Sequence, residues 1–181
     1  MSARLPSRTN RMDCAILSVS MNYSYGDGDD FDAVKTSAEE LYQTIGSVPC
    51  PHFGNAIVAF NAKGIRHLKF KSDEKARSRE DQYARLKLLH LAPKVLKLSR
   101  TVQGIWPTRQ FELQKTHSRW ERVLKDVCFY EFMAVLENVR VKVIVKEVAG
   151  GERYFWSIIP FWKLDPDNRR RILHSGDPEQ D

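Results

Sequence analysis

The dominant spacing of apolar residues changes near residue 100, from a mainly helical period before it to a strand period after it. A first helix is predicted over residues 31–45, because apolar residues recur there every three or four positions and share one face. They are Val34, Ala38, Leu41 and Ile45. Gly46 is expected to end this helix, and Pro49 and Pro51 then indicate a loop.

The next segment determines where the candidate chemistry lies. A short, buried strand is predicted at residues 55–60, and residues 61–64 are predicted to form a turn. Residues 65–70 alternate as they would on a strand edge, which would place His67 and Lys69 on one face. In a helical turn these two side chains would separate, so the conformation of this segment decides which groups lie together.

A second, strongly basic helical region follows. Ser78 is expected to cap it, with acidic residues in the first turn, and the helix should continue to about Leu91. Pro93 is expected to end this helix or to start another over residues 94–98.

Beyond residue 100 the pattern becomes that of strands. A short strand broken by Pro107 is predicted within residues 102–113, and a short amphipathic piece over residues 118–124. Three strong strand runs come next, the last two joined by a glycine-containing hairpin turn: residues 127–136, 139–148 and 152–160. Because helices come first and strands last, the sequence predicts an α+β fold, with N-terminal helices packed on an antiparallel sheet of about four strands.

These elements predict one domain between two tails. We expect a flexible N-terminal segment over residues 1–30, a single α+β domain over residues 31–163 and a loose C-terminal tail over residues 164–181. No run has the length of a membrane span, and none near the N-terminus resembles a secretory signal. Three widely spaced cysteines make no disulfide framework, so we expect a cytoplasmic protein with reduced thiols and no membrane contact.

Positive charge is concentrated in the middle of the chain. Residues 63–125 hold 17 Lys and Arg against 6 Asp and Glu, whereas the whole chain carries a formal charge of +6. This basic block indicates a polyanionic partner, most simply nucleic acid, although a solvated helix surface has a similar composition. No metal or other cofactor is expected, because Cys50 and His52 have no second pair at zinc spacing.

Several short motifs occur in a recognisable order. They are Lys63-Gly64-Ile65-Arg66-His67-Leu68, a helix rich in Arg and Leu, Leu91-Ala92-Pro93-Lys94-Val95-Leu96, and a last strand with aromatic and hydroxyl residues. In this order, residues 52–163 resemble the phage-associated nuclease domains of the barnase–EndoU–colicin–RelE-like superfamily. The resemblance implies a four-stranded antiparallel sheet whose concave face holds the active site. It also implies metal-independent RNA cleavage, often by a toxin.

By position, the resemblance implies that the catalytic residues are His67, Lys69 and Ser157, where the family more often has threonine than serine. A histidine with a pKa near 6.5 exchanges protons at neutral pH, which suits the activation of a 2′-hydroxyl or the protonation of a leaving oxygen. Arginines can bind phosphate and aromatic rings can stack on bases. The expected RNA-binding residues are Arg66, Arg77, Arg79, Arg85, Tyr154 and Trp156.

Two structural alternatives stay open at this point. His67 could be an ordinary surface histidine at a turn. On a regular strand, moreover, Ser157 faces away from Tyr154 and Trp156, so all three line one cleft only if the strand contains a bulge.

The sequence supports two functional hypotheses. The first is a metal-independent endoribonuclease of a toxin–antitoxin pair, acting on tRNA, mRNA or ribosomes and neutralised by an acidic antitoxin protein. The second is a non-catalytic RNA- or DNA-binding module that uses the same basic block in a salt-sensitive way. A nucleotide-transferring toxin is disfavoured, because the chain has no glycine-rich phosphate loop and no paired acidic metal site.

Overall fold

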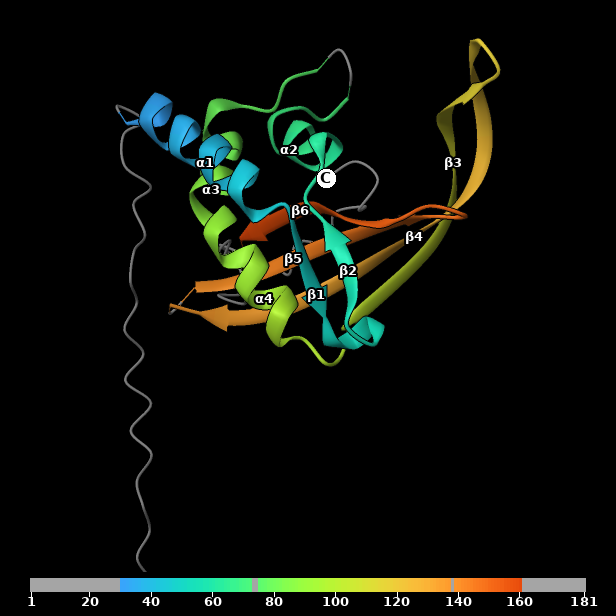
Figure 1. Ribbon diagram of the computed structural model, residues 1–181. Coiled ribbons are helices and arrows are strands. Elements are labelled where there is room, and N and C mark those ends of the chain that lie inside the picture. The colour runs from blue at the N-terminus through green and yellow to red at the C-terminus, as the bar shows by residue number, and fades with distance from the viewer. Residues whose placement is uncertain (1–29, 73–74, 138, 161–181) are drawn as a thin grey trace, which may run out of the picture.

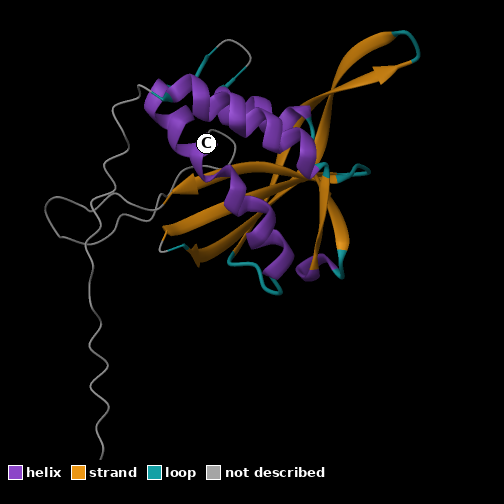
Figure 2. Cartoon of the chain, turned by 60° about the vertical axis from the view of Figure 1, so that its left-hand side comes forward, coloured by secondary structure: helices purple, strands orange, loops and turns teal. Residues whose placement is uncertain are grey.

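The computed structural model describes residues 30–72, 75–137 and 139–160, so the two expected tails fall almost entirely outside the described residues. Helices gather on one side of a single sheet (Figures 1 and 2). In chain order the elements are α1 (Phe31–Ile45), β1 (Ser47–Cys50), the 3₁₀ turn η1 (Pro51–Phe53), β2 (Ala56–Ala59), α2 (Ala62–Lys69), α3 (Arg79–Leu88), the 3₁₀ turn η2 (Leu89–Leu91), α4 (Ala92–Leu98), β3 (Gly104–Thr116), β4 (Arg119–Leu136), β5 (Val139–Val148) and β6 (Arg153–Pro160).

The sheet has six strands in the order β1-β2-β6-β5-β4-β3. Strands β3 to β6 form an antiparallel meander, which confirms the predicted α+β class. The sheet has more strands than the meander because the β1–β2 hairpin joins it beside β6. There β2 runs parallel to β6, with Ala59 opposite Tyr154. This placement brings the N-terminal end of α2, which follows β2, next to β6.

The main core lies between the helices and one face of the sheet. Side chains from α1, α3 and α4 pack there against alternate residues of the meander, among them Phe132, Val143 and Phe155. A smaller apolar cluster occupies the opposite face of the sheet, with Phe129 and Ile144 at its centre and Trp156 at its margin. The sheet therefore separates the helix-covered core from a second, more polar side on which a site can form.

Several helix and turn predictions are confirmed. The first helix spans residues 31–45 and ends at Gly46, whose φ of 59° suits a residue without a Cβ. Ser78 caps α3, because its Oγ accepts a hydrogen bond from the N–H of Asp81 at 3.2 Å. Pro93 stands in the first turn of α4 and so starts a new helix, as one of the two predicted outcomes allowed.

Residues 61–70, by contrast, form neither the predicted turn nor a strand edge. The side-chain oxygen of Asn61 accepts hydrogen bonds from the backbone N–H groups of Lys63 (3.0 Å) and Gly64 (3.3 Å), which starts α2. The six-residue alternation that suggested a strand is too short to exclude a helix, and the asparagine cap decides between them. As a result, His67 and Lys69 point in different directions.

The predictions at Pro49 and Pro107 are also wrong, as is the separate amphipathic piece predicted at residues 118–124. β3 continues through Pro107, and residues 119–124 belong to the long strand β4 rather than to a separate piece. Pro49 lies within β1 instead of bracketing a loop. The reason is common to both prolines: β1 and β3 are the two edge strands of the sheet, where a missing N–H leaves no partner strand unsatisfied.

Candidate functional site

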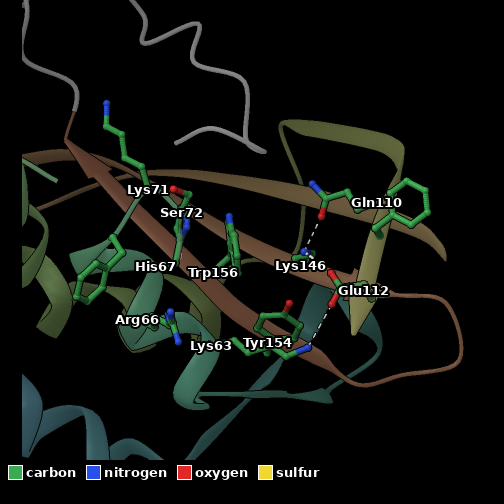
Figure 3. Close-up of a pocket in the computed structure, with 12 residues that line it drawn as sticks. Lys63, Arg66, His67, Lys71, Ser72, Gln110, Glu112, Lys146, Tyr154 and Trp156 are labelled. Carbon is green, nitrogen blue, oxygen red and sulfur yellow. Dashed lines mark hydrogen bonds and ion pairs between the residues drawn. The ribbon is translucent and has the colours of Figure 1, made fainter. Parts of the chain in front are cut away.

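A cavity of about 310 Å³ opens between α2, β3 and strands β5 and β6, as Figure 3 shows. Four cations line it, namely Lys63, Arg66, Lys71 and Lys146. Its other lining residues include His67, Gln110, Glu112, Tyr154 and Trp156. Four of the residues selected from the sequence therefore meet here, namely Arg66, His67, Tyr154 and Trp156.

A bulge in β6 gives the site its shape. Phe155 pairs with Val145 and Ser157 pairs with Ile144, so Trp156 is an extra residue between two register positions. With this extra residue, Ser157 lies on the same side of the sheet as Tyr154 rather than on the opposite one. From the sequence, Ser157 can share a side of the sheet with Tyr154 and Trp156 only if β6 contains a bulge, and β6 contains one.

Ser157 nevertheless does not reach the cavity. It is fully buried, and its Oγ is 2.5 Å from a terminal nitrogen of Arg85, which donates a hydrogen bond to it. Ser157 in this arrangement holds an arginine of α3 against β6.

His67 is a buried residue, which excludes the interpretation of a surface histidine at a turn. Only 5% of it is exposed, and its ring stacks on Trp156 with 3.9 Å between ring centres. Its Nε2 lies 3.0 Å from a terminal nitrogen of Arg77. Because a guanidinium only donates, Nε2 is the acceptor and the ring proton sits on Nδ1.

Burial and, to a smaller extent, the positive charges of Arg77, Arg85 and Lys146 together lower the pKa of His67 to about 2. The imidazole is therefore neutral at physiological pH. This differs from the proton-exchanging histidine expected from the sequence, whose pKa would lie near 6.5.

Trp156 lies between two partners. One ring face stacks on His67, and the Nζ of Lys146 is 4.6 Å from the ring centre. Figure 3 shows the indole standing between these two side chains. The base-stacking role expected of Trp156 would require one of these neighbours to move.

Behind this stack lies a buried network of two arginines and one carboxylate. Arg77 donates to the carbonyl of His67 (2.9 Å) and to Asp81 (3.1 Å), and Arg85 donates to the other oxygen of Asp81 (2.8 Å). Burial raises the pKa of Asp81, but the charges and hydrogen bonds of Arg85 and Arg77 outweigh it and leave the pKa below its ordinary value. Both arginines are buried, so they hold His67 and Ser157 in place instead of facing a ligand in this conformation.

Two more of the sequence-selected residues lie away from the cavity. The Nζ of Lys69 pairs with Glu39 of α1 at 2.9 Å, and the guanidinium of Arg79 lies 4.8 Å from the ring centre of Phe31. Both contacts join α2 or α3 to α1. The position of Lys69 follows from the helical conformation around residue 67, which the alternating pattern did not predict.

The sequence analysis missed the polar centre of the cavity. The Nζ of Lys146 donates to Gln110 (2.6 Å) and Glu112 (2.7 Å), and the Nζ of Lys63 lies 3.3 Å from the other oxygen of Glu112. Lys146 alternates with valines on β5, so the pattern placed it on a solvated face, whereas its side chain is almost fully buried. Only the register of β3, β4 and β5 brings these residues together.

Within this polar centre the pKa of Glu112 is lowered and the pKa of Tyr154 is raised. Burial raises the pKa of Glu112, but the hydrogen bonds and charges of Lys146 and Lys63 outweigh it, so the net pKa is lowered. Burial raises the pKa of Tyr154, and the negative charge of Glu112 adds to the effect. The Tyr154 hydroxyl has no hydrogen-bond partner among the residues that the structure describes. The cavity thus holds an ionised carboxylate, that of Glu112, and a protonated, buried phenol, that of Tyr154.

Within residues 30–72, 75–137 and 139–160, no group of three His, Cys, Asp or Glu side chains is arranged to hold a metal ion. In the same part of the chain, no helix combines the length and the apolar character needed to cross a membrane. No family model, curated protein or solved structure matches the chain.

The burial of His67 predicts a specific loss of stability in acid. Its pKa is lower in the folded protein than in the unfolded chain, so below pH 6.5 the unfolded chain binds a proton that the folded protein does not. The stability that depends on a neutral His67 is complete above that pH and decreases as the pH falls. Between about pH 7.5 and pH 5 the expected decrease in unfolding free energy is about 2 kcal/mol.

Urea unfolding at both pH values, with wild type and His67→Gln compared, measures this effect. The variant should lose about 2 kcal/mol less than wild type, because other titrating groups are common to both proteins. Equal losses in the two proteins would show that His67 already titrates normally in the folded state.

Proposed function

We propose that this protein is a metal-independent endoribonuclease whose active site is the cationic cavity between α2, β3, β5 and β6. The observation that carries the proposal is the combination of Glu112, Tyr154 and four cations in one cavity. Cleavage of RNA by its own 2′-hydroxyl needs three things: a proton acceptor, positive charge at the phosphate and a proton donor for the leaving oxygen. Side chains of these three kinds line this cavity.

Each group has a role that follows from its protonation state. Glu112 is ionised and accepts the proton of the 2′-hydroxyl as that oxygen bonds to phosphorus. Lys63 and Lys146 stabilise the extra negative charge on the pentacoordinate phosphate. Tyr154 stays protonated and donates to the 5′-oxygen as the bond from phosphorus to that oxygen breaks. The products are a 2′,3′-cyclic phosphate and a 5′-hydroxyl.

His67 supports this site instead of exchanging protons in it. Its neutral ring holds Trp156 against Lys146, and Arg77 fixes its orientation. Arg85 and Ser157 likewise position β6. The proposal therefore keeps the endoribonuclease expected from the sequence but moves the acid–base role from His67 to Glu112 and Tyr154.

The RNA target and the protein partner belong to the same proposal. Phosphate-binding cations around a cavity suit tRNA, mRNA or ribosomal RNA, without favouring one of them. As a free endoribonuclease would damage its own cell, we expect it to act as a toxin with an acidic antitoxin as protein partner.

One observation favours a second function. The neutral His67 and the enclosed Trp156 leave the two residues best known for RNA chemistry and stacking without direct access to a ligand. A non-catalytic RNA- or DNA-binding module would use Lys63, Arg66 and Lys71 alone, and its binding would weaken steeply with salt.

Total cellular RNA incubated with the purified protein in EDTA separates these functions. Wild type should produce discrete fragments with 2′,3′-cyclic phosphate ends. Tyr154→Phe should slow cleavage by about 10²–10⁴-fold. Since the removed hydroxyl has no described partner, this variant should fold and bind RNA normally.

Lys97→Ala is the matched control, because Lys97 is an exposed cation on α4 that does not line the cavity. It should cleave like wild type. Intact RNA with wild type, together with salt-sensitive binding, would overturn the nuclease proposal in favour of the binding module. Absence of both cleavage and binding would contradict both functions.

A further inference from the structure

Strands β3 and β4 continue beyond β5 as a two-stranded ribbon, here defined as residues 109–116 paired with residues 119–126. Figure 1 shows it extending away from the body of the sheet. Four large apolar residues on it are between 50% and 69% exposed: Phe111, Leu113, Trp120 and Leu124. Monomeric proteins seldom expose so much apolar surface in one place without a binding role.

The register places these four side chains on one face of the ribbon. Phe111 is opposite Leu124, and Leu113 and Trp120 follow at alternate positions on the same side. Exposure alternates in the same way, because Gln110, Glu112 and Val123 on the other face are half-buried. The ribbon therefore has an apolar face and a second face that belongs to the cavity.

β3 is also an open edge. In the described part of the chain it lies at the end of the sheet and pairs with β4 alone. An edge strand presents backbone N–H and C=O groups that another strand can bind. Extended segments commonly add to such edges, with side-chain pockets on alternate positions giving specificity.

Charge indicates the chemistry of the added segment. On the cavity face, Lys125 is opposite Gln110, whereas on the apolar face Arg109 is already paired with Asp126 at 3.0 Å. The cavity face adds further cations, among them Lys63 and Lys71. A second copy of this chain would bring like charges to the same edge and be repelled, so an acidic partner fits better.

We propose that the ribbon binds an acidic protein partner, one segment of which adds to β3 as a strand with alternating apolar and acidic side chains. Its apolar side chains pack beside Phe111 and Leu113, and its acidic side chains lie on the cavity face near Gln110, toward Lys63, Lys71 and the mouth of the cavity. This inference rests on the edge, the exposed face and the charges, and it stands whether or not the cavity cleaves RNA. If the cavity does cleave RNA, the same segment would hinder access to it.

The test uses a fluorescent peptide of about ten residues in which glutamate and valine alternate. Its length is close to that of the part of β3 that continues beyond β5. Fluorescence anisotropy with the full chain should show saturable binding that weakens as salt is raised. A peptide with lysine in place of glutamate, and one with the same residues in two blocks, should bind at least about tenfold more weakly, because they lose the charge or the alternation.

Leu113→Ser should weaken binding of the alternating peptide by about tenfold. Leu98→Ser is the matched control, since Leu98 is another exposed leucine (70%, against 58% for Leu113) on α4, away from the ribbon, and it should bind like wild type. Equal affinity for all three peptides, or an unchanged affinity in Leu113→Ser, would overturn the proposal. So would self-association of the full chain in sedimentation that Leu113→Ser abolishes, or a loss of RNA binding in Leu113→Ser without any peptide binding.

Discussion

Replacing Glu112 by glutamine is expected to lower the rate of RNA cleavage by about 10²–10⁴-fold while RNA remains bound. Glu112 is the acidic side chain that lines the cavity, and its lowered pKa keeps it ionised and able to accept a proton at physiological pH. Glutamine keeps the size and one oxygen but cannot accept the proton. It also removes a negative charge near the phosphate, so RNA affinity should stay the same or rise.

Single-turnover cleavage and a separate binding titration distinguish these effects. Glu137→Gln is the matched control: Glu137 also contacts two nitrogen-bearing side chains, Lys94 and His90, but far from the cavity and on an exposed surface. It should leave cleavage unchanged. If Glu112→Gln cleaves RNA at the wild-type rate, the proton acceptor is a different group.

The pH dependence gives an independent test of the same assignment. Because the pKa of Glu112 lies below its ordinary value, the wild-type rate should fall only as the pH drops through that lowered pKa, below about 4.5. His67 should add no step near pH 6.5, since its pKa is far lower in the folded protein. A rate that halves near pH 6.5 in a protein still folded by circular dichroism would return the proton-exchanging role to His67.

Gly64→Ala is expected to destabilise the protein by about 1–3 kcal/mol, although alanine normally stabilises a helix relative to glycine by about 1 kcal/mol. The reversal has a steric cause. A Cβ at position 64 would overlap the carbonyl oxygen of Phe155 on β6 and the hydroxyl of Tyr42 on α1, and a backbone oxygen cannot turn aside. Since α2 also carries Lys63, Arg66 and His67, the same change should impair the cavity.

Urea unfolding compares this variant with Gly151→Ala. Gly151 lies in the β5–β6 turn at ordinary φ, where the nearest atom to an added Cβ is the carbonyl oxygen of Val148 at 3.2 Å. That substitution should change the unfolding free energy far less. A stabilised Gly64→Ala protein would mean that α2 does not lie so closely against β6.

Local chemistry predicted much of the fold because the signals lie within a few residues of each other. The periodic apolar face of α1, the Ser78 cap of α3 and the Gly150 turn, with its φ of 75°, each depend on neighbouring residues alone. The same local reasoning failed at residues 61–70, where the Asn61 cap outweighed a short alternation. It failed at Pro107 because a strand's place at the sheet edge is not a local property.

The sequence by itself determined the α+β class, with helices before the main strands, and the central concentration of positive charge, and it selected Arg66, His67, Tyr154 and Trp156 as site residues. Tertiary structure alone decided what those residues can do. Lys146 and Glu112 reach the site through strand register across 34 residues, and the bulge at Trp156 turns Ser157 toward Arg85. The charge state of His67 depends on burial and on cations contributed by α3 and β5, as well as on Arg77, which precedes α3. A sequence lists these groups without their distances, and distance and burial set the pKa values on which the chemistry depends.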